Sequence, residues 1–156
     1  MQEGTIEAIF VSPAAEELPS EVDSVNAISG KGLEGDRYFD DDGTFSDDPR
    51  SNGRDITLVE VEAVEGLARD TGIVLDPAET RRNVLTRGVA LNDLVGRRFT
   101  VGEIECVGRR LCDPCSHLEK LTRPGVLKGL VNRGGLRADI VRGGVIRPGD
   151  AVTELP

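Results

Sequence analysis

The sequence Phe99-Thr100-Val101-Gly102-Glu103-Ile104-Glu105-Cys106-Val107 has a pattern typical of two short strands. It contains two runs of strand length, residues 99–101 and 104–107, on either side of a glycine-containing turn. Short runs of β-branched and aromatic residues separated by such turns are typical of neighbouring strands. Cys106 lies in phase with Ile104, so we expect its side chain to be a small buried apolar group.

The same pattern recurs along most of the chain. Aromatic residues are scarce and 19 residues are glycine, so Val, Ile and Leu must provide most of the core and tight turns must join the strands. We expect residues 5–11 and 22–28 to pair as a hairpin, with Ile6, Ala8 and Phe10 on one side of the first strand. The remaining expected strands are residues 56–59, 83–86, 136–141 and 145–152.

Two segments show helical spacing instead. Val61, Val64, Leu67 and Ala68 recur at helical intervals up to Thr71-Gly72, where the glycine can cap the helix. A short second helix is expected around residues 126–131. About seven strands with one or two short helices predict a mainly β fold, a closed or nearly closed barrel, because closure removes exposed sheet edges. A β-sandwich is the alternative.

Residues 1–156 are expected to form a single domain, since the chain has the common length for one core and shows neither a repeat nor a linker. Residues 29–54 are rich in Gly, Asp, Ser and Pro and predict a long acidic surface loop. A loop of this length is either functional or partly disordered. Gly35-Asp36-Arg37 could contribute to a site, whereas residues 40–48 are expected to be a solvated tip.

The charge distribution restricts the class of protein. The net charge of -9 and the pI of about 4.7 argue against a general nucleic-acid binder. The sequence shows neither a basic region followed by an apolar run at its start nor an apolar stretch of about 20 residues, which predicts a cytoplasmic protein that is neither secreted nor inserted into a membrane. Arginines gather in the second half, which is compatible with a local cationic pocket, although genome composition or adaptation to salt explains most of them.

All three cysteines and the only histidine lie in residues 106–117. An odd number of cysteines without a secretion signal favours free thiols or a metal over disulfides. A zinc site could use Cys106, Cys112, Cys115 and His117, but structural zinc normally takes two spaced ligand pairs. A thioredoxin-like dithiol would use Cys112 and Cys115, but that motif belongs at a helix start in a βαβ context.

The remaining interpretation is a single activated thiolate at Cys115, which ligates a soft metal or carries sulfur. Arg109, Arg110 and His117 lie close in sequence, and positive charge lowers the pKa of a thiol. A short helix over residues 117–121 would add its dipole. An ordinary surface role for His117 is equally compatible with the sequence.

A second polar cluster, Thr80-Arg81-Arg82-Asn83, precedes an expected strand. Arginine holds oxyanions through a planar fork, and the asparagine amide suits the edge of a heterocycle. Adjacent residues of a strand face opposite ways, so at most one arginine would reach a given pocket. A solvated strand edge is the simpler interpretation of this motif taken alone.

Taken together, these motifs resemble the MOSC domain, named for the C-terminal domain of molybdenum cofactor sulfurases. The resemblance covers nearly the whole chain. It rests on Gly35-Asp36-Arg37, Thr80-Arg81-Arg82-Asn83, Leu94-Val95-Gly96 with Val101-Gly102, Cys112-Asp113-Pro114-Cys115, and Gly134-Gly135-Leu136-Arg137-Ala138 through Gly143-Gly144-Val145 to Gly149-Asp150.

The resemblance implies a barrel like that of pyruvate kinase and a binding site for the molybdenum cofactor, a pterin dithiolene with a terminal phosphate (molybdopterin). The family's cysteine, which ligates molybdenum or carries sulfur, falls on Cys115, with Cys112 auxiliary. By resemblance Arg81, Arg82 and Asn83 line the cofactor site, and Arg37 and Arg137 are further candidates, with His117 near the thiolate. Thiolate is a soft ligand suited to molybdenum, and arginines suit phosphate.

Three functions follow as expectations. The first is a molybdenum-cofactor component of a reductase system for N-hydroxylated compounds, which needs a redox partner protein and a small-molecule substrate. The second is a sulfur carrier that accepts a persulfide on Cys115 from a cysteine desulfurase, because the sequence has no pyridoxal-phosphate-binding aminotransferase domain of its own. The third is a zinc-stabilised structural domain. The chain is thus expected to act as an oxidoreductase component or as a sulfurtransferase-type carrier.

Overall fold

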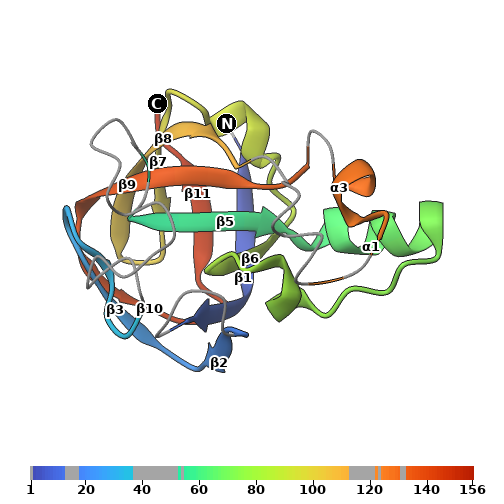
Figure 1. The fold of residues 1–156 in the computed structure, drawn as a ribbon. Coiled ribbons are helices and arrows are strands. Elements are labelled where there is room, and N and C mark those ends of the chain that lie inside the picture. Colours follow the sequence, from blue (N-terminus) through green and yellow to red (C-terminus); the bar gives the residue numbers. More distant parts are fainter. Residues whose placement is uncertain are drawn as a thin grey trace.

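The structure is a computed structural model that describes residues 2–12, 18–36, 53, 55–112, 122, 124–130 and 133–156, with only the backbone of residues 127 and 128. Figure 1 shows a barrel of strands with the helices α1 and α3 beside it. The strands of the barrel sheet are β1 (Glu3–Val11), β2 (Ser20–Val22), β5 (Ile56–Glu60), β6 (Val84–Arg87), β7 (Arg98–Val101), β8 (Ile104–Leu111), β9 (Leu136–Arg142) and β11 (Ala151–Glu154).

Seven of these strands close into a barrel in the order β11-β7-β8-β9-β5-β6-β1, because β1 also pairs with β11. Thr5 lies opposite Ala151 and Glu3 opposite Thr153 at the closing pair, and β2 extends the sheet from the other end of β1. The pairs within the barrel are antiparallel except β5 with β6, which is parallel. The prediction of a closed, mainly β barrel of about seven strands is confirmed.

Parallel neighbours need a long connection, and α1 (Val61–Thr71) with the 3₁₀ helix η1 (Pro77–Thr80) provides it between β5 and β6. As predicted, α1 ends at a glycine cap: Gly72 is left-handed with φ 76°, and its N–H donates to the Ala68 carbonyl at 2.9 Å. The second predicted helix is α3 (Val126–Gly129). A second 3₁₀ helix, η2 (Leu91–Leu94), was not expected from the sequence.

A separate three-stranded sheet shows where the strand predictions were wrong. It consists of β10 (Gly144–Ile146), β3 (Val25–Ile28) and β4 (Gly32–Leu33). Within residues 20–28, only residues 20–22 pair with β1. The chain then turns at Asp23-Ser24, and residues 25–28 join the second sheet. Residues 145–152 are likewise two strands, β10 and β11, because the turn at residues 147–150 breaks the run.

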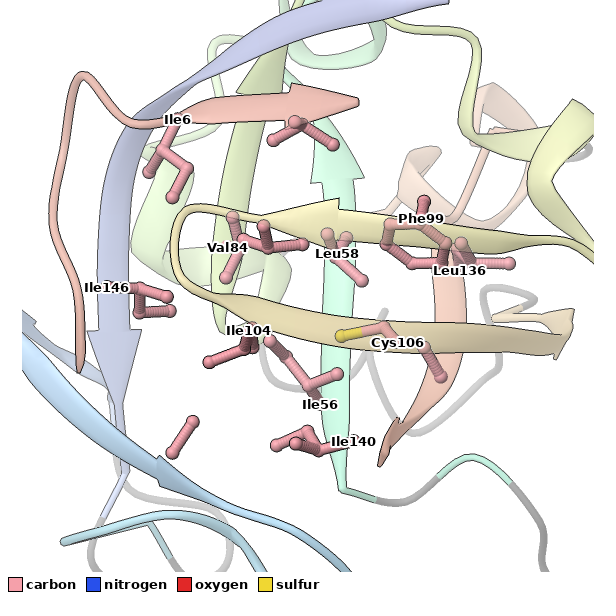
Figure 2. Packing of buried hydrophobic residues seen from close by; sticks show 14 of the residues in the cluster. Ile6, Ile56, Leu58, Val84, Phe99, Ile104, Cys106, Leu136, Ile140 and Ile146 are labelled. Carbon is pink, nitrogen blue, oxygen red and sulfur yellow. The ribbon is translucent and has the colours of Figure 1, made fainter. Parts of the chain in front are cut away.

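Apolar side chains form two cores. The larger core fills the barrel and includes Ile9, Leu58, Phe99, Ile104 and Leu136, all with 0% exposure; Figure 2 shows part of it. The second core lies where α1 and α3 pack against the barrel. The prediction that Ile6, Ala8 and Phe10 share one side of β1 was wrong. Ile6 belongs to the barrel core and the other two to the second, because the register shifts at a bulge between residues 6 and 8.

In the part of the predicted 29–54 loop that the structure describes, residues 29–36 form turns and β4, and the Gly53 N–H donates to the Asp139 carboxylate of β9 at 3.0 Å. Asp36 is buried there, and its carboxylate accepts a hydrogen bond from the Ser12 N–H at 2.9 Å. The expected tip at residues 40–48 lies outside the described residues. None of the helices described here has the length and apolar character needed to span a membrane.

Candidate functional site

The Thr80-Arg81-Arg82-Asn83 cluster leads directly into β6, as predicted. Thr80 is the last residue of η1, and the other three residues form the turn between η1 and β6. A capping box begins η1: the Asp76 carboxylate accepts from the Ala78 N–H at 2.9 Å, and the Glu79 carboxylate accepts from the Asp76 N–H at 3.0 Å. Arg81 then adopts a left-handed conformation, with φ 63° and ψ 24°, at the end of η1. This turn, rather than strand alternation, determines where the two arginines lie.

Arg81 is the one non-glycine residue with positive φ in the described part of the chain. A left-handed conformation costs an ordinary residue about 1–2 kcal/mol, and such conformations are found disproportionately at functional sites. Its side chain is half-buried, and its Nη2 atom is fully covered by protein. Arg81 therefore brings a positive charge into a partly desolvated position, where charge attracts anions more strongly than in water.

Arg82 connects three parts of the chain. Its Nε donates to the Gly134 carbonyl at 2.9 Å, and its Nη2 donates to the Cys112 carbonyl at 3.4 Å. The Cys112 N–H in turn donates to the Gly135 carbonyl at 2.7 Å. Arg82 thus contacts both ends of the segment that contains Cys115: Cys112, which follows β8, and Gly134, which precedes β9.

Asn83 is buried, and its side-chain amide binds the protein at both ends. Its Oδ1 accepts from the Thr57 N–H at 3.0 Å and from the Thr57 hydroxyl at 3.1 Å, while its Nδ2 donates to the Phe10 carbonyl at 3.2 Å. These contacts join β5 and β1 to the start of β6. They lie next to the turn at Arg81-Arg82, which we call the arginine turn. Asn83 therefore anchors the turn to β5 and β1, and its contact with the cofactor stays a prediction.

Arg137 lies on the outer face of β9, since its neighbours Leu136 and Ala138 point into the barrel. Its pairing partners across the sheet are Thr57 and Arg110. On the same face Arg109 forms an ion pair with Asp139 at 2.7 Å. Arg137 follows Gly135 by two residues, so it lies beside the arginine turn but on the outer surface.

The structure describes two of the three cysteines, Cys106 and Cys112, and both are buried. Cys106 is fully buried inside the barrel, as predicted, and Figure 2 shows it among apolar side chains. Burial, followed by the negative charges of Asp55, Asp139 and Glu105, raises the pKa of its thiol far above the ordinary value. A neutral thiol in an apolar core does not suit zinc. Cys112 is also buried, at 2% exposure, directly after the end of β8.

Cys115, His117, Arg37 and the expected helix over residues 117–121 lie outside the described residues. Among the residues that the structure does describe, no group of three or more His, Cys, Asp or Glu side chains could hold a metal ion. The structure therefore brings together Arg81, Arg82 and Asn83 with Cys112 and the Gly134-Gly135 pair, and it places Arg137 on the adjacent outer surface.

Sequence reasoning missed the role of the Gly134-Gly135 pair in this arrangement. Gly135 has φ 116°, and a Cβ atom there would collide with the Leu58 carbonyl oxygen and meet the Arg82 Nε at 3.5 Å. Only glycine lets the chain pass so close to β5 at this angle. A glycine pair directly before an apolar run was the available signal.

Comparison with known proteins decides the family. The MOSC domain model matches residues 44–153. The chain belongs to the MOSC domain family. No curated protein matches its sequence.

Solved structures share the fold of this MOSC domain. The YUAD protein from Bacillus subtilis is 18% identical with a TM-score of 0.79, over 96% of this chain and 94% of that one. YiiM from Geobacillus stearothermophilus is 16% identical with a TM-score of 0.75, over 98% and 75%. YiiM from Escherichia coli is 16% identical with a TM-score of 0.71, over 100% and 71%. At these identities the likeness concerns the fold.

Proposed function

We propose that this MOSC domain protein binds the molybdenum cofactor, with the Cys115 thiolate as a ligand of molybdenum, and serves a cytoplasmic reductase system for N-hydroxylated compounds. The observation that carries the proposal is the position of Arg82, which donates to the carbonyls of Cys112 and Gly134. Cys115 follows Cys112 by three residues. The segment that carries it, which we call the cysteine segment, therefore begins at Cys112 beside the arginine turn.

The described residues supply positive charge that suits the phosphate of the proposed cofactor. Arg81 and Arg82 supply two guanidinium groups that stay charged at any physiological pH. The partly buried charge of Arg81 favours a phosphate, because desolvated charges interact strongly. Arg137 and Arg37 would add positive charge at the margins of the site, and His117 would do so near the thiolate.

When bound, the cofactor supplies the redox chemistry through molybdenum, and the protein supplies binding, orientation and electrostatics. Arg81 neutralises the anionic end of the cofactor. Asn83 holds the arginine turn in place through its hydrogen bonds to Thr57 and Phe10. Cys115 contributes a thiolate, the ionisation state that metal binding requires. Electrons come from a separate redox partner protein.

The test is metal and pterin analysis of the full chain produced in a host that makes the cofactor. We expect molybdenum and pterin in the wild type and at least about tenfold less molybdenum in Cys115→Ala, because the thiolate ligand is lost. Cys112→Ala is the matched control and should retain the metal. A folded wild-type protein with neither molybdenum nor pterin would contradict the proposal.

The same protein can be tested as a sulfur carrier. Incubation with a cysteine desulfurase, a pyridoxal-phosphate enzyme, and free cysteine is followed by mass spectrometry of each cysteine. Added sulfur on Cys115 of a protein that contains no molybdenum would establish the carrier function in place of the reductase function. Sulfur on Cys112 or Cys106 alone would argue against Cys115 as the carrier.

A further inference from the structure

The chain leaves the barrel after β8 and returns at the start of β9, and these two points are in contact. Leu111 pairs with Leu136, and the Cys112 N–H donates to the Gly135 carbonyl at 2.7 Å. We call the group formed by Cys112, Gly134 and Gly135 the neck. At the neck, the end of β8 and the approach to β9 are joined directly by this hydrogen bond.

Arg82 binds both sides of the neck from a third part of the chain. Its Nε reaches Gly134 and its Nη2 reaches Cys112, at 2.9 and 3.4 Å. A guanidinium group offers donors in fixed and different directions within one plane, whereas an ammonium group is a single point charge. Hydrogen bonds from a charged donor are also stronger than those between neutral groups. Arg82 therefore holds the two sides of the neck at a fixed separation.

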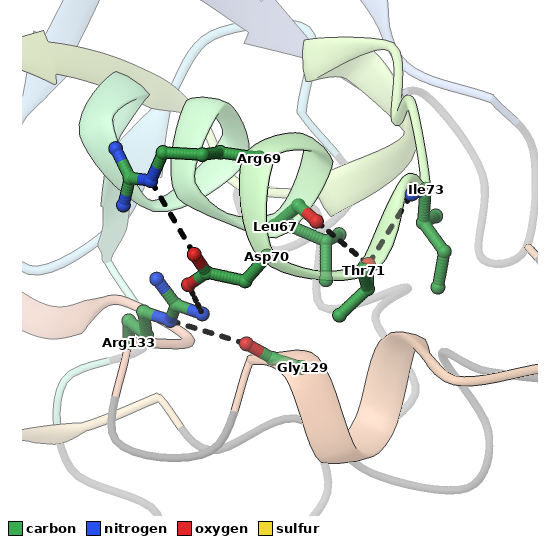
Figure 3. A network of polar contacts seen from close by, with 7 residues as sticks. All are labelled: Leu67, Arg69, Asp70, Thr71, Ile73, Gly129 and Arg133. Atoms are coloured by element: carbon green, nitrogen blue, oxygen red, sulfur yellow. Dashed lines mark hydrogen bonds and ion pairs between the residues drawn. The ribbon is translucent and has the colours of Figure 1, made fainter.

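The far part of this segment is fixed separately. Figure 3 shows Arg133, whose Nε donates to the Gly129 carbonyl at 3.1 Å and whose Nη2 reaches the Asp70 carboxylate at 3.4 Å. Val126 and Leu130 are buried in the second core against α1. Because α3 and Arg133 are attached to α1 in this way, loss of Arg82 would release the neck without releasing α3.

We propose that Arg82 is a positioning residue, which fixes the root of the cysteine segment through the Cys112 and Gly134 carbonyls and acts on Cys115 through the backbone. This inference deepens the proposed function and rests on it for the role of Cys115. It replaces a direct contact between Arg82 and the cofactor with a contact between Arg82 and the main chain. Arg81, the adjacent residue, keeps the role of binding the anion.

The experiment measures the alkylation rate of each cysteine by iodoacetamide in the full-length protein, with mass spectrometry to separate the sites. Cys112 reports on the neck because it is only 2% exposed, and Cys106 reports on the barrel because it is fully buried. In Arg82→Gln we expect the Cys112 rate to rise at least about tenfold, the effect of losing hydrogen bonds from a charged donor. The Cys106 rate should stay unchanged.

Two variants serve as controls. Arg82→Lys keeps the charge but reaches one carbonyl, so its Cys112 rate should lie between those of the wild type and Arg82→Gln. Arg81→Gln removes the neighbouring guanidinium and should leave the Cys112 rate as in the wild type. An unchanged Cys112 rate in both Arg82 variants would overturn the proposal, and so would a parallel rise for Cys106, which indicates general destabilisation. If Arg82→Gln does not fold, Arg82→Lys alone decides, by the same criterion.

Alkylation of Cys112 does not depend on the cofactor, so the outcome separates this inference from the proposed function. A released neck in a protein that never contains molybdenum would leave Arg82 as the residue that fixes the neck and remove the proposed function. If the protein does contain molybdenum, Arg82→Gln should lose it together with the rise at Cys112. Loss of molybdenum with an unreactive Cys112 would indicate direct cofactor binding and overturn the inference.

Discussion

At the scale of single residues, Cys106 shows how one position in a strand pattern determines chemistry. Its phase with Ile104 predicts burial, and the structure places it inside the barrel with 0% exposure. Burial raises the pKa of its thiol far above the ordinary value of 9.0. The thiol therefore stays protonated in the folded protein at pH values where an unfolded chain would release the proton.

This difference predicts a pH dependence of stability with a definite sign. Above pH 9 the unfolded state loses the Cys106 proton and the folded state keeps it, so the free energy of unfolding falls as the pH rises. The slope approaches about 1.4 kcal/mol per pH unit for one proton. Between pH 9.5 and 10.5, the stability of the wild type minus that of Cys106→Ala should fall by about this amount, in urea unfolding under reducing conditions. A difference that stays constant with pH would contradict the prediction.

The residues of the candidate site could be named from the sequence, but their contacts could not. The motif Thr80-Arg81-Arg82-Asn83 was identified as a polar cluster, with alternation as the expected geometry. The left-handed conformation of Arg81 turns the chain at that point. As a result Arg82 meets the carbonyl of Cys112, 30 residues away in the sequence. Long-range contacts of this kind have no local signal in the sequence.

At the scale of elements, strand and helix types were predicted well, and the errors have local causes. The run of residues 22–28 spans two sheets because the chain turns at Asp23-Ser24, and residues 145–152 are divided by the turn at Pro148-Gly149. Apolar residues on both sides of each turn hid the interruption from a pattern based on hydrophobicity. The bulge in β1 was missed in the same way, because Ala8 and Ile9 are both apolar. It places Ile9 in the barrel core and Ala8 in the second core.

Two glycines at element ends allow a controlled test of the packing at the neck. Gly72 and Gly135 both have positive φ, but a Cβ atom at Gly72 meets nothing within 4 Å, whereas one at Gly135 collides with the Leu58 carbonyl. We expect Gly72→Ala to lose about 1 kcal/mol through backbone strain alone. Gly135→Ala should lose at least about 2 kcal/mol, since strain and collision combine. Urea unfolding measures both, and equal losses would show that the neck accommodates a side chain.

At the scale of the whole molecule, the pairing of β1 with β11 converts an open sheet into a barrel. The sequence predicts closure as a class of solution, because exposed edges are unfavourable. It does not identify which strands meet, since the residues of β1 and β11 are far apart in the chain. The parallel β5–β6 pair, in which β6 is the other neighbour of β1 in the barrel, was also not expected.

Closure predicts cooperative protection of the backbone. We expect amides of β1 and β11 to exchange with deuterium as slowly as those of β8 and β9, because breaking either terminal strand opens the whole barrel core. The small sheet of β3, β4 and β10 contributes fewer strands and should exchange faster. Hydrogen exchange with mass spectrometry gives the comparison. Exchange of β1 and β11 at least about tenfold faster than that of β8 and β9 would show that the barrel opens at this seam.

Residue 3 lies opposite residue 153 in the closing pair, so the first and last strands end close together in space. A few added residues would join the two ends of the chain without crossing the barrel, and a cut in an exposed connection would then give the same strands in a rotated order. The arginine turn meets the opposite end of β1, where the Phe10 N–H donates to the Asn83 carbonyl. A protein attached at either terminus would therefore begin beside the closing pair, whereas the arginine turn lies at the other end of β1.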